Sequence, residues 1–169
     1  YQPENLFEER LGKSSICHTF LLECHKGGHC VMTEQWDKES KEALIAYRIN
    51  RADETLREAE LMYNEGLYNG AVNRLYYACY YISIALLLKK DILAQTHSGV
   101  KTMISLHYIS KGIIPKEIGK YLLLLFERRQ SGDYDDFVLC DQDDVIDLRD
   151  KAIAYITCAK SLLAEKEEQ

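Results

Sequence analysis

The chain has 169 residues, of which 47% are hydrophobic and 28% are charged, as is typical of an ordinary globular domain with one sizeable core. Its formal net charge of -6 weighs against a general nucleic-acid coat or a binder of anionic membranes, since both need a basic surface, although a local basic groove stays open. With only 2 Pro and 9 Gly, the sequence favours long helices over many short strands.

Residues 1–31 differ in character from the rest of the chain. They combine a polar start with a brief apolar patch at 20–22 and a loop-like segment at 26–29. Met32 then precedes the first helical pattern, with Thr33 as its expected N-cap, and Met32 is a candidate for the biological start. We therefore divide the chain into an N-terminal extension over 1–31, either not native or poorly ordered, and a helical domain over 32–169.

Two long helices are expected next, over 33–64 and 68–90. Apolar residues recur in the first at steps of three and four, and Gly66 is expected to end it as a left-handed cap. The second is apolar nearly all round between Ala78 and Leu88, so it should be the most buried helix of the fold.

A third helix is expected over 97–110, and Pro115 suits the first turn of a fourth helix. Arg128-Arg129 should close this fourth helix, where they complement its C-terminal dipole, and Gly132 should break it.

An acidic linker is expected over 133–144, followed by a last helix over 142–166 with Asp141 as its N-cap. The linker lacks the Gly and the closing Glu of an EF-hand loop, so we interpret it as solvated rather than metal-binding. The fold class is therefore all-α, an antiparallel up-and-down bundle of four to five helices.

Arg74 is expected on the apolar side of the second helix, between the small residues Ala71 and Ala78. An unpaired buried charge is costly, so it needs a partner. One interpretation is a structural ion pair with an acid on another helix, with Asp133 as a candidate. The other is contact with a phosphate or RNA, because the guanidinium fork suits phosphate oxygens.

Four tyrosines on the same helix form two pairs spaced four apart: Tyr76 with Tyr80, and Tyr77 with Tyr81. They are interpreted either as core packing with hydroxyls at the rim, or as a stacking surface for a base or a partner helix. The predicted ligand or partner groove includes one of these tyrosines, and it consists of Arg74, Tyr77, Arg128, Arg129, Asp133 and Tyr134.

The chain has six Cys, and no metal or cofactor is expected. Cys79 and Cys158 fall inside apolar helical patterns and are interpreted as small core residues. The extension clusters thiols and imidazoles, which are zinc ligands, but it has no paired Cys-x-x-Cys knuckles, so an unstructured or packed tail is favoured. The zinc candidates are Cys17, Cys24, His25, His29 and Cys30.

Without an apolar run of membrane-span length or a secretory signal, a cytoplasmic protein with reduced thiols is expected, with no membrane partner.

Several short pieces stand in an order that resembles the HEPN domain family from about Ile45 to Leu163. The resemblance is closest to stand-alone bacterial and archaeal HEPN proteins encoded beside minimal nucleotidyltransferases, and it extends to the C-terminal region of sacsin. The pieces are Glu58-Ala59 with Leu61, Gly66-Leu67-Tyr68, Ala71 with Arg74-Leu75-Tyr76-Tyr77-Ala78, Leu86-Leu87-Leu88, His97-Ser98-Gly99-Val100, Arg129 with Gly132-Asp133-Tyr134-Asp135, and Ala152-Ile153.

The resemblance implies an up-and-down bundle of four or five helices that is often dimeric, akin to the helical domain of kanamycin-type nucleotidyltransferases. It also implies that many members are metal-independent ribonucleases, with a motif of Arg, four to six residues, then His. Here Arg128 or Arg129 matches the Arg, but Tyr134 stands where His is expected. A phenol titrates near ~10 and is a poor general base, so the sequence favours a binding module over an enzyme.

His97 is the nearest substitute for the missing His, since it opens the third helix, where the helix dipole favours neutral imidazole. The alternative interpretation of His97 is a capping or packing residue.

The sequence leaves three hypotheses for the function of the chain. The first is a nucleotide- or RNA-associated regulatory protein acting with a minimal nucleotidyltransferase in a toxin–antitoxin-like system. The second is a divergent ribonuclease using Arg129 with His97 or Tyr134. The third is a structural homodimerisation module.

Overall fold

A computed structural model describes residues 37–134 and 140–165, with side chains in the fourth helix described up to Arg128. Residues 39–169 form one compact unit, and it contains the helices. The described residues contain no strand. Their elements are α1 (Lys38–Asn64), α2 (Tyr68–Lys89), α3 (His97–Ile104), the π-helical turn η2 (Ser105–Ile109), α4 (Lys116–Tyr134) and α5 (Gln142–Ala164). The predicted all-α fold class is confirmed.

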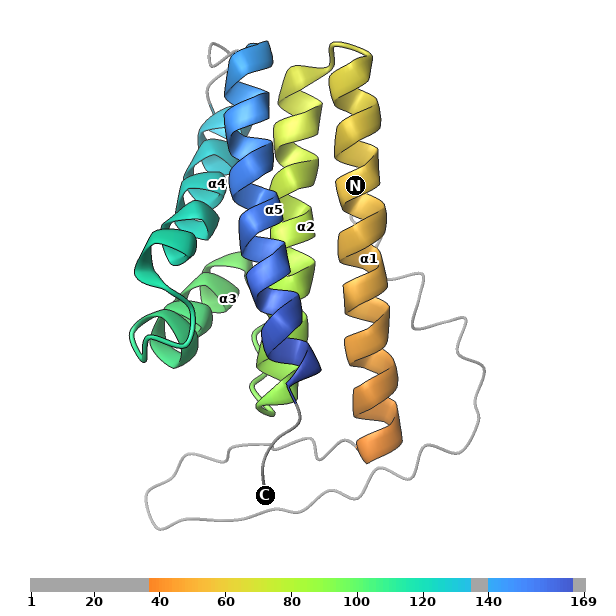
Figure 1. The fold of residues 1–169 in the computed structure, drawn as a ribbon, viewed down its shortest axis with the longest axis vertical. Helices are drawn as coiled ribbons and strands as arrows, with labels where there is room; N and C mark the ends of the chain where they lie inside the picture. Colours follow the sequence, from red (N-terminus) through yellow and green to blue (C-terminus); the bar gives the residue numbers. More distant parts are fainter. Residues whose placement is uncertain (1–36, 135–139, 166–169) are drawn as a thin grey trace. The chain divides into compact units, whose positions relative to one another are not determined.

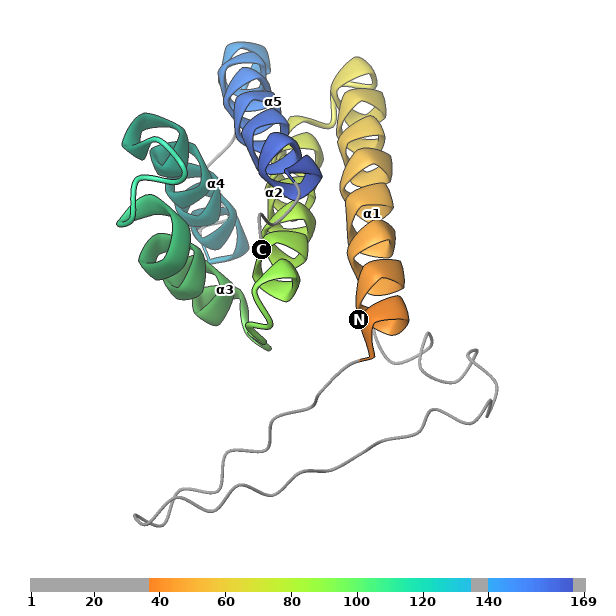
Figure 2. The ribbon, with the colours of Figure 1, turned by 60° about the horizontal axis from the view of Figure 1, so that its bottom comes forward.

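The long helices alternate in direction, so the bundle is up-and-down as expected (Figure 1). In Figures 1 and 2, α1 and α4 lie on opposite sides of α2, and α5 runs beside α2. The small residues Ala71, Ala78 and Ala85 are fully buried on α2 and let its neighbours approach closely. As predicted, α2 is the most buried helix, and it contributes thirteen buried residues.

By length and hydropathy alone, α2 passes the test for a membrane-crossing helix, which the sequence interpretation did not anticipate. The same test is passed by the core helix of many bundles, and 72% of the most apolar window of α2 is buried by the rest of the protein. Its apolar surface is therefore covered by other helices of the chain. Cys79 on this helix is fully buried and Cys158 on α5 is half-buried, in line with packing roles.

Helix ends follow the local chemistry of the sequence. Gly66 adopts a φ of 73° two residues after the end of α1, the left-handed conformation expected of a glycine cap. Asp141 caps α5 as predicted: its carboxylate accepts from the Asp144 amide at 2.9 Å, and Asp144 reciprocates at 3.3 Å. At the other end of α5, the Lys89 ammonium donates to the last carbonyl groups, including Leu162 at 2.8 Å.

The expected break at Gly132 is wrong, because α4 continues to Tyr134. A single glycine inside a helix costs only about 1 kcal/mol relative to alanine, which neighbouring turns can offset. Arg128 and Arg129 consequently lie more than one turn before the end of α4 and do not close it. The predicted start of the first helix at Thr33 lies outside the described residues. In the described part of the chain, α1 begins at Lys38.

Gly119 marks the closest approach between α4 and η2, and it yields a stability prediction. A Cβ at this position would lie 2.7–2.8 Å from the Cδ1 and Cγ1 atoms of Ile109. Overpacking costs about 1–3 kcal/mol, against a gain of about 1 kcal/mol in helix propensity. Gly119→Ala should therefore lower the free energy of unfolding, by about 1 kcal/mol.

Chemical denaturation measures this change, and Gly70→Ala is the matched control. A Cβ at Gly70 would make one tight contact, 3.0 Å from the thioether sulfur of Met62, and that flexible side chain can move. An increase in stability for Gly119→Ala equal to that for Gly70→Ala would contradict the close approach.

Candidate functional site

Small buried residues, partly buried apolar side chains and polar contacts together hold α1 against the bundle. The buried residues described on α1 are the small Ala52, Thr55 and Ala59. Among the described side chains, four ion pairs connect α1 to other parts of the chain: Glu58 with Arg74, Asp53 with Lys160, Glu60 with Arg149, and Lys41 with Asp91. The interface between α1 and α2 is therefore a place where arginines can lie without being buried in the core.

Arg74 lies at this interface rather than in the apolar core, which corrects the expectation of a buried charge. Its guanidinium Nη1 donates to Oε2 of Glu58 at 3.3 Å, and the two side chains are 35% and 40% exposed. Its Cζ atom lies 5.4 Å from the ring centroid of Tyr77. The predicted ion pair with an acid on another helix is confirmed, but its described partner is Glu58. The side chain of Asp133 lies outside the description.

The four tyrosines of α2 divide into two roles. Tyr76 and Tyr80 are buried, whereas Tyr77 and Tyr81 are half-buried on the side of α1. The rings of Tyr77 and Tyr81 lie 6.2 Å apart at a tilt of 36°. Core packing therefore describes the first pair, and the second pair keeps the surface position that a stacking role requires.

Two arginines of α1 complete this surface, and the sequence interpretation missed both. The Cζ atoms of Arg48 and Arg51 lie 5.8 and 5.5 Å from the ring centroid of Tyr81. Arg51 also donates to Glu54 at 2.7 Å. Arg48, Arg51, Thr55 and Glu58 follow one another at helical spacing, so a polar stripe on the inner side of α1 was the available signal.

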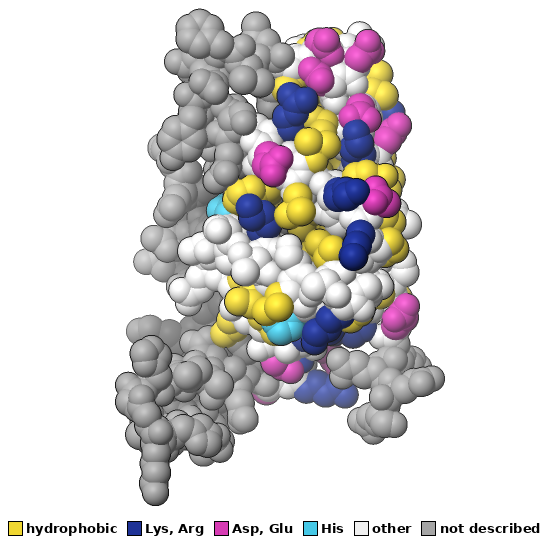
Figure 3. All heavy atoms as spheres, turned by 90° about the vertical axis from the view of Figure 1, so that its left-hand side faces the viewer, with side chains coloured by type: hydrophobic (Ala, Val, Ile, Leu, Met, Phe, Trp, Pro, Cys, Tyr) yellow, Lys and Arg dark blue, Asp and Glu magenta, His cyan; other side chains and the backbone are white. Residues whose placement is uncertain are grey.

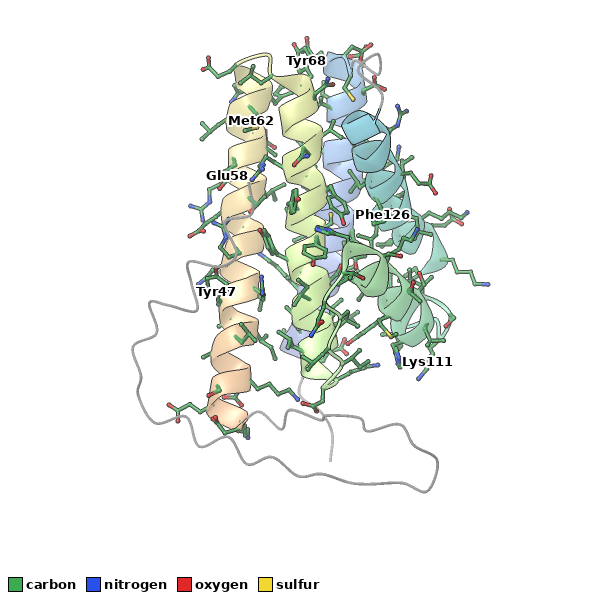
Figure 4. All side chains as sticks on the ribbon, turned by 180° about the vertical axis from the view of Figure 1, so that it is seen from behind. Tyr47, Glu58, Met62, Tyr68, Lys111 and Phe126 are labelled. Carbon is green, nitrogen blue, oxygen red and sulfur yellow. The ribbon has the colours of Figure 1, made fainter. Side chains whose placement is uncertain are left out.

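We call this surface the Arg–Tyr face, and define it as Arg48, Arg51, Arg74, Tyr77 and Tyr81. Figure 4 looks onto α2 between α1, where Tyr47 and Glu58 are labelled, and the helices α3 and α4. The guanidiniums supply charged donors, and the rings supply flat surfaces beside them. Such a combination can bind an anion next to a planar group.

His97 lies beside the Arg–Tyr face as the first residue of α3. Its Nδ1 atom and the hydroxyl of Tyr76 are 2.7 Å apart, and its ring stacks on Tyr80 with centroids 4.3 Å apart. It also meets the half-buried Tyr77 edge-on at 5.6 Å. The cap of α3 is Thr96, whose hydroxyl accepts from the Gly99 amide. His97 is therefore a packing residue with a fixed ring orientation.

Arg128 lies on α4 and is exposed. No hydrogen bond, ion pair or ring contact joins it to Arg74 among the side chains that are described. Arg129, Asp133 and Tyr134 belong to α4 by backbone, and their side chains lie outside the description. Of the predicted groove, Arg74 and Tyr77 lie together, while Arg128 is on the helix that flanks the other side of α2 (Figure 4).

Arg128 instead influences Cys140, which lies just before α5. Burial, together with the charge of Asp144, raises the pKa of the Cys140 thiol, and the positive charge of Arg128 opposes this rise. The backbone amide of Cys140 donates to the Asn69 side chain at 2.9 Å, which fixes the thiol near the start of α2.

Replacing Arg128 should therefore make Cys140 less reactive. Removing the cation raises the pKa of the thiol further, so less thiolate is present at pH 8 and alkylation of Cys140 should be slower in Arg128→Gln. Peptide mass spectrometry resolves this site from the other cysteines. Lys120→Gln, which removes a cation paired with Glu117 on the same helix, should leave the rate unchanged; equal rates in all three proteins would place Arg128 away from Cys140.

The side of the bundle that carries α3 and α4 is locally basic. Residues 89–128 hold seven Lys or Arg and three Asp or Glu, in a chain with a net charge of -6. Figure 3 shows the face over α4, where Lys and Arg side chains lie among apolar ones. Leu106, which is 53% exposed, belongs to η2 beside this helix. The sequence left room for such a local basic region despite its acidic total.

No group of His, Cys, Asp and Glu that could hold a metal ion occurs among the described side chains, those of 37–128 and 140–165. The predicted zinc candidates all lie in the N-terminal extension, outside those ranges. These are Cys17, Cys24, His25, His29 and Cys30.

The described residues form an all-α up-and-down helical bundle with a basic side and an arginine–tyrosine surface. The sequence matches the family described as HEPN domain over residues 45–168, so the chain belongs to the HEPN family and the predicted resemblance is confirmed. The match covers the described parts of all five helices beyond the first turns of α1.

Three relatives illustrate the family. A UPF0332 protein of Thermotoga maritima is 35% identical over 125 residues, which cover 74% of this chain and 95% of that protein. Two proteins of Methanocaldococcus jannaschii carry the name "Putative toxin". One is 31% identical, covering 70% of this chain and 80% of the relative, and the other is 33% identical, covering 58% and 72%.

Proposed function

We propose that this chain is a toxin-like HEPN protein, a nucleotide- or RNA-associated binding and regulatory module that acts with a minimal nucleotidyltransferase partner. The family match and the names of the two Methanocaldococcus relatives support the toxin-like part of the proposal. A cytoplasmic homodimer is the expected free form.

The half-exposed Arg74 on the ring of Tyr77 is the observation that carries the proposal. A solvent-exposed ion pair contributes only about 0–1 kcal/mol, so a phosphate or an acidic partner residue can compete with Glu58 at little cost to the fold. The neighbouring rings offer a stacking surface for a base or contact area for a partner helix. The same surface thus serves either mode of association.

Co-expression with the product of the adjacent reading frame tests the partnership. We expect a tagged form of this chain to retain an untagged nucleotidyltransferase through size-exclusion chromatography, and induction of this chain alone to slow growth of its host more than co-induction does. Clean separation of the two proteins would remove the partner from the proposal.

A divergent metal-independent endoribonuclease is the second candidate, because the Tyr76 hydroxyl holds the imidazole of His97 in one orientation. In this candidate Arg129 holds the phosphate and His97 or Tyr134 moves the proton. Total RNA incubated with the protein and a chelator provides the test. Cleavage that disappears in Arg129→Ala and in His97→Ala supports this candidate, and cleavage that is unchanged, or no cleavage by the parent, removes it.

A further inference from the structure

One end of the bundle is acidic and carries two exposed leucines. The α1–α2 turn and the start of α5 meet there, where the amide of Gln142 donates to the hydroxyl of Tyr63 at 3.0 Å. Leu61 and Leu67 are exposed at this turn. Residues 61–73 and 140–148 contain no Lys or Arg and five acids, which are Glu65, Asp141, Asp143, Asp144 and Asp147. Figure 3 shows acidic side chains gathered at the top, which is this end.

The opposite end is basic and carries three exposed apolar side chains. Lys90 follows α2, and its Nζ atom lies 4.3 Å from the ring centroid of Tyr108 in η2. The segments that this contact joins, 86–93 and 105–116, hold one acid, Asp91, which is paired with Lys41 of α1. They hold four lysines, which are Lys89, Lys90, Lys111 and Lys116. The exposed apolar residues are Leu93, Leu106 and Ile113.

These two surfaces are named by their charge. The acidic end is defined as Leu61, Glu65, Leu67, Asp141 and Asp143, and the basic end as Lys90, Leu93, Leu106, Lys111 and Ile113. In Figure 4 the labels of Met62 and Tyr68 lie toward the acidic end, and the label of Lys111 lies toward the basic end.

Helix dipoles explain part of the charge at each end but not the exposed leucines. Acids suit the N-terminus of α5, and lysines suit the C-terminus of α2. Leu106 lies two residues after the buried Ile104, so helical geometry places its side chain on the outer side of η2. Five of the six exposed large apolar residues in the described parts of the chain lie at the two ends, and the sixth is Ile153. Apolar residues gathered within a charged rim are typical of an interaction surface.

We infer that the acidic end of one molecule docks onto the basic end of another, so that copies of this chain associate head to tail. Opposite charges draw the two ends together, and their leucines form the apolar centre of the contact. The interface is heterologous, so each copy that joins leaves one acidic and one basic end free. Such growth goes beyond the closed homodimer of the proposed function, and it involves neither the Arg–Tyr face nor a nucleotide.

Sedimentation velocity of the full chain, at high micromolar concentration, tests the inference. Interfaces smaller than about 1,200 Å² are weak, and charge attraction between exposed groups is screened by salt. The species seen at about 500 mM salt is therefore the basic unit, whether monomer or dimer. At about 20 mM salt we expect particles of three or more units that grow with concentration. One unit at both salt concentrations, or growth that stops at two units, would overturn the inference.

Two double variants each remove one end. Leu61→Ser with Glu65→Lys alters the acidic end, and Leu106→Ser with Lys111→Glu alters the basic end. All four side chains are exposed, so both variants should show the circular dichroism and thermal unfolding of the parent. Each variant alone should associate at least tenfold more weakly than the parent, because it loses an apolar contact and reverses a charge. Mixing the two should restore association, since the mixture again contains an intact end of each kind; no restoration would overturn the head-to-tail arrangement.

Ile153→Ser with Arg57→Glu is the matched control. It replaces one exposed apolar residue and reverses one exposed cation, both in the middle of their helices and away from the two ends. This control should associate like the parent, and equal weakening would overturn the role of the ends. A parent that stays one unit at low salt, while the end variants lose the nucleotidyltransferase, would assign the ends to that partner instead of a second copy and also overturn the inference.

Discussion

Leu86→Ala is expected to lower the free energy of unfolding by roughly 2–5 kcal/mol, a large share of the stability of a domain of this size. Leu86 is fully buried in the last turn of α2, the helix that packs against α3, α4 and α5. Its carbonyl also accepts from the hydroxyl of the buried Tyr108 at 2.5 Å. Truncation of the Leu86 side chain therefore leaves a cavity, and Tyr108 cannot move freely to fill it because its hydroxyl is hydrogen-bonded to the backbone.

Urea denaturation followed by circular dichroism measures this loss. Leu61→Ala is the matched control, because Leu61 is 67% exposed on α1 and its truncation should change stability by less than about 0.5 kcal/mol. Similar small effects for both variants would show that α2 is not the buried centre of the fold. Its apolar side chains would then need an explanation other than core packing.

Arg74→Gln is expected to separate binding from folding. The Arg74–Glu58 pair is exposed enough that its loss should change stability by no more than about 1 kcal/mol. The same substitution should weaken association with the nucleotidyltransferase by about tenfold or more, because arginines beside aromatic rings are frequent centres of binding energy. Thermal unfolding and a calorimetric titration with the partner provide the two readings.

The double variant Glu58→Gln with Arg74→Gln removes the pair without leaving a lone charge. It should fold like the parent and bind as weakly as Arg74→Gln. A different outcome would assign the pair a purely structural role. In that outcome Arg74→Gln unfolds at a lower temperature, the double variant regains the stability of the parent, and both variants bind the partner normally.

Local chemistry made much of the fold predictable. The expected second helix over 68–90 agrees with α2 to within a residue. Its bounds were predictable because the apolar run and the glycine before it are signals from residues close together in the sequence. Asp141 was predictable as a cap for the same reason, because its partner Asp144 is three residues away. Continuation of α4 through Gly132 was not, since one unfavourable residue is outweighed by its neighbours.

The site was only partly predictable, because its partners come from different helices. Arg74 and Tyr77 could be singled out as unusual on an apolar helix, yet the acid that pairs with Arg74 stands sixteen residues earlier, across the α1–α2 turn. Arg48 is one of many charged residues in its helix, so the sequence alone does not single it out. Its unpaired Nε and its place by Tyr81 depend on how α1 docks, which periodicity alone does not give.

Chemical-shift mapping with the neighbouring nucleotidyltransferase tests most directly whether the Arg–Tyr face is the contact surface of this HEPN protein. Side-chain and amide resonances of ¹⁵N-labelled chain would be followed while unlabelled partner is added. The largest changes should occur at Arg48, Arg51, Arg74, Tyr77 and Tyr81. Changes confined to α3, α4 and α5, with these five residues unaffected, would contradict the assignment of function to the surface between α1 and α2.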